Sequence, residues 1–169
     1  DQVFIWSRGE EMVTEAFPEI AQMALTWPED VILDGELLVW GEDRPRDFND
    51  LQQRLGRKKL SADILKRAPV TFMAYDLLHL NGQEYTAFPL NERRAKLEEF
   101  SSSRTHPRYR LSQIVPFSDW EEAKKIQASS RQIGAEGLML KKLSSAYVTG
   151  RKRGVWWKFK VEPYTLDAV

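Results

Sequence analysis

Two short segments near the C-terminal end of the chain carry side chains that could bind phosphate. Glu136 precedes a glycine and an apolar run, and a second, aromatic segment contains Lys158 and Lys160. Alternate residues of a strand point the same way, so the two lysines share one face and Trp157 and Phe159 share the other. Two ammonium groups roughly 7 Å apart repel each other unless an anion lies between them. The spacing therefore predicts a phosphate-binding strand, with a solvated basic edge strand as the alternative.

Two acidic residues stand within or at the start of apolar strand patterns. Glu36 ends the tripeptide Asp34-Gly35-Glu36, and Glu136 leads into the next apolar run. Burying a carboxylate is costly unless it is paired or binds a cation. Together with the lysine pair, Glu36 and Glu136 predict a site that holds a divalent cation and phosphates. The alternative for each acid is a surface position or an internal arginine partner.

Three further side chains suit such a site. Tyr75 lies in the middle of an apolar strand pattern, where a ring is usually core but could stack on a nucleobase at a pocket wall. Arg8 follows a predicted strand in a turn, and its guanidinium fork matches a phosphate. Arg54 lies on a predicted helix. For both arginines a solvated surface position is the alternative.

Composition narrows the function classes. The 169 residues carry 25 basic and 25 acidic side chains, no cysteine and only two histidines. Disulfides and thiolate metal sites are therefore excluded, and a histidine-based metal site or triad is disfavoured. Residues 141–160 nevertheless contain seven basic residues and no acidic one, which predicts a local anion-binding surface on a neutral body. No apolar run approaches the roughly 20 residues of a membrane span.

Strands and helices alternate irregularly along the chain. The patterns predict an α+β fold with mainly antiparallel sheets flanked by helices. The expected strands cover residues 3–6, 31–40, 70–80, 108–117, 138–141 and 155–160. Helices are expected at residues 18–25, 47–55, 91–100 and 118–133, with another that Ser61 caps.

Five segments, taken in order, resemble the nucleotidyltransferase motifs of ATP-dependent DNA ligases. They are Ser7-Arg8-Gly9-Glu10, Asp34-Gly35-Glu36, Phe72-Met73-Ala74-Tyr75-Asp76, Glu136-Gly137-Leu138-Met139-Leu140-Lys141 and Trp157-Lys158-Phe159-Lys160. Residues 145–154 also resemble the loop before the last motif in bacterial and archaeal members. Residues 163–169 resemble the switch into that family's OB domain. The resemblance implies a ligase- or capping-enzyme-like nucleotidyltransferase domain over 1–162, N-terminally incomplete, and a linker or OB domain from 163.

The resemblance also implies a reaction. A lysine attacks the α-phosphate of ATP to give lysyl-AMP, AMP passes to the 5′-phosphate of a DNA nick, and the 3′-hydroxyl then displaces AMP. The implied catalytic residues are Glu36, Glu136, Lys158 and Lys160, with Glu36 and Glu136 holding Mg²⁺. The implied nucleotide contacts are Arg8, Glu36, Tyr75, Lys158, Lys160 and Arg54, and the implied DNA contacts are Arg151, Lys152 and Arg153. Nicked double-stranded DNA is the implied partner of a monomeric, cytoplasmic and nucleoid-associated bacterial or archaeal protein without membrane contact.

One family motif is missing from these residues. The nucleophile lies in a Lys-x-Asp-Gly-x-Arg motif upstream of the Ser-Arg segment, and here the only Asp-Gly has Ile32 at the lysine position. The chain by itself is therefore expected to be inactive. An RNA ligase or an mRNA-capping nucleotidyltransferase is the first alternative. A non-catalytic nucleic-acid-binding domain is the second, although it would leave the acid pair Glu36 and Glu136 without a role.

Overall fold

Two long apolar strands form the centre of the fold. In the computed structural model, which describes residues 2–55, 57, 60–148, 150 and 153–162, β1 (Val31–Val39) pairs antiparallel with β2 (Val70–Leu80). The predicted turn at Asn81 and Gly82 has positive φ angles of 49° and 84° and leads into the short β3 (Gln83–Glu84). The short β4 (Tyr109–Leu111) lies parallel to β2 and completes a four-stranded sheet.

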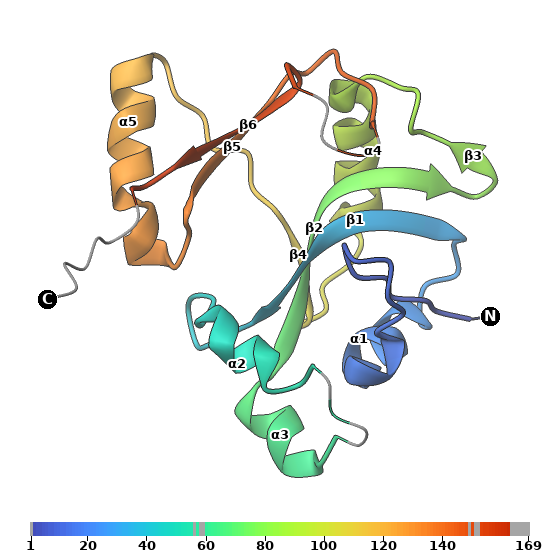
Figure 1. Ribbon diagram of the computed structural model, residues 1–169. Helices are drawn as coiled ribbons and strands as arrows, with labels where there is room; N and C mark the ends of the chain where they lie inside the picture. Colours follow the sequence, from blue (N-terminus) through green and yellow to red (C-terminus); the bar gives the residue numbers. More distant parts are fainter. Residues whose placement is uncertain (1, 56, 58–59, 149, 151–152, 163–169) are drawn as a thin grey trace, which may run out of the picture.

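The helices α1 (Pro18–Ala24), α2 (Phe48–Gln52) and α4 (Leu90–Ser102) pack against the strands of the main sheet and contribute to its core (Figure 1). The short η1 (Thr14–Ala16) precedes α1, and α3 (Ala62–Arg67) lies beyond the end at which β2 begins. Ser61 caps α3 as predicted, because its hydroxyl accepts a hydrogen bond from the Ile64 amide at 3.3 Å. The core joins α1, α4 and the sheet through buried side chains such as Phe17, Leu77 and Leu97.

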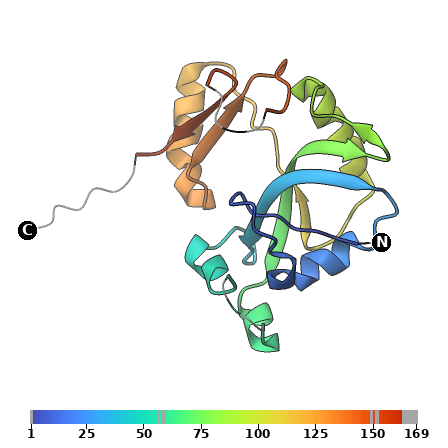
Figure 2. The ribbon, with the colours of Figure 1, turned by 45° about the vertical axis from the view of Figure 1, so that its right-hand side comes forward.

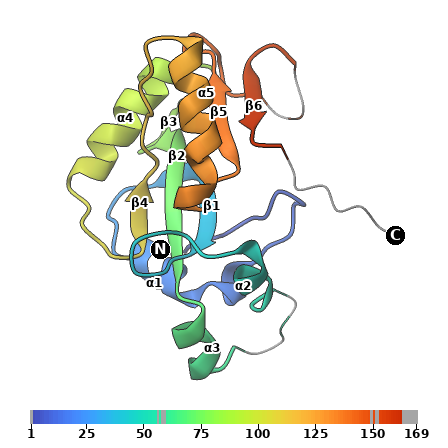
Figure 3. The same ribbon diagram turned by 90° about the vertical axis from the view of Figure 1, so that its left-hand side faces the viewer.

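A second, smaller sheet stands beside the first. The hairpin of β5 (Gly137–Lys141) and β6 (Trp156–Lys160) packs its outer face on α5 (Trp120–Ser129), which continues as η2 (Ser130–Ile133) (Figures 1 and 3). Asp119 caps α5 by accepting a hydrogen bond from the Glu122 amide at 2.8 Å. The Trp120 and Phe159 rings meet edge to face with centroids 6.4 Å apart.

The two sheets touch at both ends of the hairpin. After β1, Arg44 donates a hydrogen bond to the Gln132 carbonyl in η2 at 3.1 Å. At the other end, beyond β5, the Tyr147 hydroxyl donates to Asp34 of β1 at 2.8 Å. Figure 2 shows the hairpin standing beside β1 and β2, with the tip of the N-terminal segment (dark blue) reaching toward the hairpin. The hairpin is therefore held against the main sheet at two separate points.

The predicted fold class is confirmed, and several predicted boundaries are wrong. Residues 3–6 form only an isolated bridge between Trp6 and Met12. The strand expected at 108–117 is limited to β4, since residues 113–118 are exposed and pair with no strand in the described chain. The helix expected through residue 55 ends at Gln52. The predicted linker at 163–169 lies outside the described residues.

No helix in the described part of the chain has both the length and the apolar character that crossing a bilayer requires.

Candidate functional site

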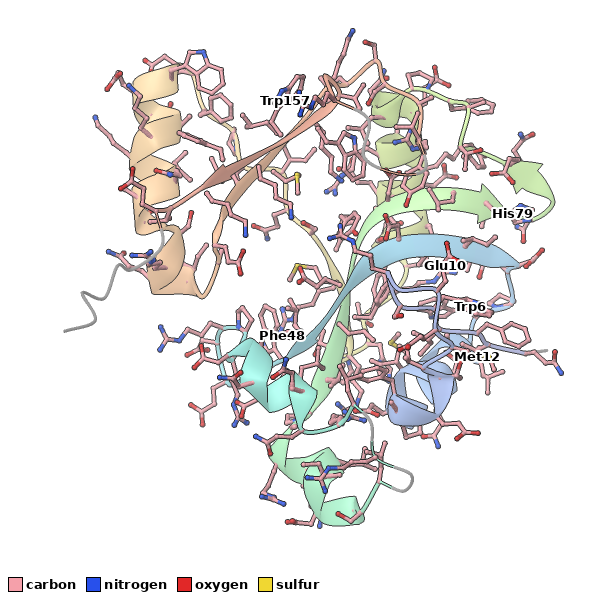
Figure 4. All side chains as sticks on the ribbon, in the orientation of Figure 1. Trp6, Glu10, Met12, Phe48, His79 and Trp157 are labelled. Carbon is pink, nitrogen blue, oxygen red and sulfur yellow. The ribbon has the colours of Figure 1, made fainter. Side chains whose placement is uncertain are left out.

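The inner face of the hairpin carries the predicted basic residues. Lys158 lies opposite Met139 across the hairpin, and Lys160 lies opposite Gly137, so all four positions share one face, the face from which the charge of Lys158 acts on Glu36 of β1. Trp157 is 49% exposed on the outward side (Figure 4), while Phe159 packs on α5. The predicted alternation of lysines and aromatic residues is confirmed.

Glu36 of β1 is the point where the charges of the site converge. Partial burial raises the pKa of the Glu36 carboxyl above its ordinary value, and the neighbouring Glu136 carboxylate raises it further. The positive charges of Arg8 and Lys158 oppose both effects. Arg8, Glu136 and Lys158, which come from three other segments, therefore lie close enough to Glu36 for their charges to act on its carboxyl.

Glu136 is held at the edge of the hairpin by an ion pair. Its carboxylate accepts a hydrogen bond from the Lys160 ammonium group, and this contact holds the pKa of Glu136 below its ordinary value. The side chains of Glu136 and Lys160 are 80% and 50% exposed, so solvent and ligands can reach both. Exposed ion pairs contribute little to stability, so this one holds Glu136 and Lys160 together only weakly.

Gly137 is required for the hairpin to place Glu136. Its φ of 142° belongs to backbone that side-chain-bearing residues rarely adopt, and a Cβ there would clash with the Phe159 carbonyl and lie 2.7 Å from the Lys160 Cα. We expect Gly137→Ala to destabilise the hairpin by roughly 2–4 kcal/mol, the combined cost of backbone strain and overpacking. Hydrogen exchange at the β5 and β6 amides measures this loss.

Gly82→Ala is the matched control, because Gly82 has a φ of 84° but nothing within 4 Å of its added Cβ. It should cost only about 1–2 kcal/mol of backbone strain, and it should leave exchange in β5 and β6 unchanged. Equal protection of the hairpin in both variants would show that the close approach at Gly137 is not needed.

A β-bulge aims the ring of Tyr75. Asp34 pairs with Asp76 and Gly35 pairs with Ala74, so Tyr75 is an extra residue in β2 with no partner in β1. Bulges of this kind redirect a side chain and recur beside active sites. Gly35 allows the close packing, because a Cβ there would clash with the Phe72 ring and lie 2.6 Å from the Met73 carbonyl oxygen.

The Tyr75 side chain has two further neighbours that the sequence did not predict. Its hydroxyl donates a hydrogen bond to Asp34 at 3.0 Å. The Lys141 ammonium group lies 4.4 Å from the centre of the Tyr75 ring and 3.9 Å from that of Trp156. Burial lowers the pKa of Lys141, and the charges of Asp76 and Asp34 counteract this shift. Asp34 and Lys141 both stand inside the predicted motif segments, which is the only sequence signal that could have singled them out.

Arg54 does not belong to this site, and its predicted role as a nucleotide contact is wrong. The residue is fully buried, and its guanidinium donates to the Glu19 carboxylate at 2.5 and 2.7 Å. Two backbone carbonyls, those of Ala16 and Ala68, accept its remaining hydrogen bonds at 2.9 and 3.1 Å. Its donors are thus directed into the protein, where they join α1 to the segment after α2.

The other predicted cationic contacts differ in position. Arg8 is exposed at the tip of the N-terminal turn, whose bonds run from the Glu10 amide to the Ser7 carbonyl and from the Ser7 amide to the Glu11 carbonyl. Arg153 is exposed, whereas the predicted DNA contacts at 151 and 152 lie outside the described residues.

The residues 1–160 match the family described as the ATP dependent DNA ligase domain. The chain belongs to this family. Curated relatives of the ligase domain include a probable DNA ligase of Koribacter versatilis (strain Ellin345), 34% identical over 190 residues, which cover 100% of this chain and 33% of the relative. A DNA ligase of Thermococcus onnurineus (strain NA1) is 35% identical over 172 residues, which cover 100% of this chain and 30% of the relative. The chain thus spans about a third of these relatives.

Solved structures agree with this family. The ligase domain from M. tuberculosis LigD matches with a TM-score of 0.72 and 28% identity, over 93% of this chain and 46% of that one. A mycobacterial DNA ligase D complexed with ATP and MES matches with a TM-score of 0.73 and 28% identity, over 94% and 48% of the two chains. The predicted resemblance to ATP-dependent DNA ligases and their nucleotidyltransferase fold is confirmed. The relatives are bacterial and archaeal.

Proposed function

We propose that this ligase domain is most of the adenylation domain of an enzyme that seals nicks in duplex DNA through lysyl-AMP and DNA-adenylate intermediates. The observation that carries the proposal is the convergence of Glu36, Glu136, Arg8 and Lys158 beside the inner face of the hairpin. A cluster of two acids and two cations suits a ligand that carries phosphates together with a metal ion. A domain that only bound DNA backbone would have no use for the acids.

Each side chain has a distinct role in this proposal. Tyr75 stacks on adenine, and Glu36 contacts the ribose or supports the metal. Lys158 and Lys160 neutralise the charge that develops on the phosphates, which is an electrostatic contribution to the barrier. Arg8 contacts the AMP or the nick phosphate. The exposed Glu136–Lys160 ion pair is accessible to the ligand, so a metal ion can take the place of Lys160 beside Glu136 and a phosphate can take the place of Glu136 beside Lys160.

The two acids fit a magnesium ion that is shared with the nucleotide. Glu136 raises the pKa of Glu36, so the two negative charges repel each other and a cation between them would relieve the repulsion. Mg²⁺ commonly takes one or two carboxylates and completes its shell with water and substrate phosphates. In the described residues no cluster of three or more histidine, cysteine or acidic side chains could hold a metal alone. When bound, Mg²⁺ would neutralise phosphate charge.

The DNA side of the proposal rests on the basic loop. Arg151, Lys152 and Arg153 contact the sugar-phosphate backbone of the nicked duplex, which positions the protein without reading sequence. The protein acts as a monomer associated with the nucleoid in the cytoplasm. Residues from 163 onward lead into the OB domain.

Covalent adenylation tests the proposal. We expect the complete protein, incubated with labelled ATP and Mg²⁺, to form an acid-labile lysine adduct and to pass its AMP to nicked DNA. The 169-residue chain should form no adduct, because it contains no Lys-x-Asp-Gly motif. Lys141 and Lys158 should not replace the missing nucleophile, since attack needs an in-line approach at about 3 Å.

The experiments on the complete protein and on the 169-residue chain test different parts of the proposal. A complete protein that binds nicked DNA but never becomes labelled would favour the non-catalytic binding domain. An adduct on the 169-residue chain, mapped by mass spectrometry, would identify a nucleophile within these residues and overturn the assignment of the lysine to the upstream motif.

A further inference from the structure

A single carboxylate joins two tyrosines from distant parts of the chain. Asp34 of β1 accepts a hydrogen bond from the Tyr75 hydroxyl on one oxygen at 3.0 Å and from the Tyr147 hydroxyl on the other at 2.8 Å. All three residues are half-buried. A tyrosine hydroxyl is ordinarily protonated at neutral pH, and burial and the negative charge of Asp34 raise the pKa of both tyrosines further, so both are hydrogen-bond donors.

Tyr147 is held in place independently of Asp34. Its backbone amide donates to the Thr86 carbonyl at 2.8 Å, and the Arg93 guanidinium lies 5.7 Å from the centre of its ring. Trp156 of β6 meets the same ring edge to face, with centroids 6.1 Å apart. Tyr147 is therefore a fixed anchor that connects the hairpin and the segment after β3 to the carboxylate.

Tyr75 needs an anchor of this kind. The bulge leaves Tyr75 without a partner in β1, so the ladder of β1 does not fix its position. Lys141 covers one face of the ring at 4.4 Å. A base that stacks on Tyr75 must use the opposite face or displace the lysine, and either requires a ring held in one orientation. The hydroxyl bond to Asp34 holds the far end of the ring.

We propose that Tyr147 is a positioning residue for the nucleotide base, and that it acts through Asp34 on the Tyr75 ring. This inference rests on the proposed function, in which Tyr75 stacks on adenine. Tyr147 touches neither the base nor the phosphates in this scheme. Its hydroxyl fixes the carboxylate, and the carboxylate fixes the stacking ring, so the loss of one hydroxyl should affect recognition of the base alone.

The test compares ATP with inorganic tripolyphosphate in the complete protein. Tripolyphosphate carries the phosphates but no base, so it should use the lysines without Tyr75. Tyr147→Phe should weaken ATP binding by roughly 2- to 10-fold, the range for one lost hydrogen bond, and leave tripolyphosphate binding unchanged. Tyr75→Phe should have the same selective effect. In a Tyr75→Ala background, Tyr147→Phe should have no further effect on ATP.

Tyr109→Phe is the matched control. Tyr109 also loses a hydroxyl contact, 2.7 Å from the Ser101 hydroxyl, but it lies in the core away from the hairpin. It should change the affinity of neither ligand. Asp34→Ala should reproduce the selective loss of ATP, and if that variant does not fold, the two Tyr→Phe variants still decide the question.

Two results would overturn the positioning role while leaving the proposed function intact. One is wild-type affinity for ATP in Tyr147→Phe. The other is an equal loss of affinity for ATP and tripolyphosphate, which would make Tyr147 a general support of the hairpin. If the wild-type protein bound neither ATP nor tripolyphosphate, that result would instead contradict the proposed function, and the positioning role of Tyr147 would be contradicted with it.

Discussion

Replacing Lys158 by alanine in the complete protein should slow adenylate formation by roughly 100-fold or more, the usual effect of removing one group that stabilises developing charge. Lys158 is held on a paired strand opposite Met139, and its charge acts on Glu36 across the site. A cation carried by a paired strand needs less reorganisation as charge develops than one on an unpaired segment, and it is therefore worth more to a reaction. Single-turnover labelling with ATP measures the rate.

The basic loop and an outer lysine provide the controls. Lys124 on α5 is a surface lysine whose side chain is 60% exposed, and Lys124→Ala should label at the normal rate. Neutralising Arg151, Lys152 and Arg153 together should weaken DNA binding. It should also reduce the salt dependence of binding by the equivalent of up to about three phosphate contacts, and the rate of labelling with ATP should not change. A loop variant that loses labelling, or a Lys158→Ala variant that loses only DNA affinity, would reverse the two roles.

Breaking the buried pair of Asp76 and Arg93 should have the largest effect on stability. The Arg93 guanidinium of α4 donates two hydrogen bonds, of 2.8 and 2.9 Å, to the Asp76 carboxylate of β2, and neither side chain has any exposed surface. It also donates to the carbonyls of Phe88 and Ser145 at 2.6 and 3.0 Å. Arg93→Met leaves a buried carboxylate without its partner, which should cost about 3–5 kcal/mol.

Hydrogen exchange at the amides of α4 and β2 in the complete protein measures this cost, because it reports on the stability of this domain separately from that of the rest of the protein. Protection should fall by more than about 100-fold in Arg93→Met. The exposed pair of Lys96 and Glu99 on the same helix is the control, with side chains 42% and 70% exposed. Lys96→Ala should change stability by less than about 1 kcal/mol. Similar protection in the two variants would show that the buried pair does not stabilise the fold.

Features that depend on neighbouring residues were predictable from the sequence. The run from Val70 to Leu80 is strongly apolar and forms β2 over those residues. Alternation in β6 placed Lys158 and Lys160 on one face, and a hydroxyl before a helix start identified the cap Ser61. Strand period and capping act over a few residues, so a short window of sequence contains all the information they need.

Features that depend on distant residues were decided by the tertiary structure. From the sequence, Arg54 could be a surface arginine on a helix. In the structure it is buried, and its guanidinium donates hydrogen bonds to the Glu19 carboxylate, 35 positions away in the chain. The Asp34 carboxylate accepts a hydrogen bond from the Tyr147 hydroxyl, and 113 positions of the chain separate the two residues. The bulge at Tyr75 depends on the register of β1 against β2, two strands that lie far apart in the chain. Composition and spacing identify residues that can do chemistry. Only the packing of the two sheets determines which of these residues come into contact, because the residues next to a side chain in the sequence do not specify its partner in a distant segment.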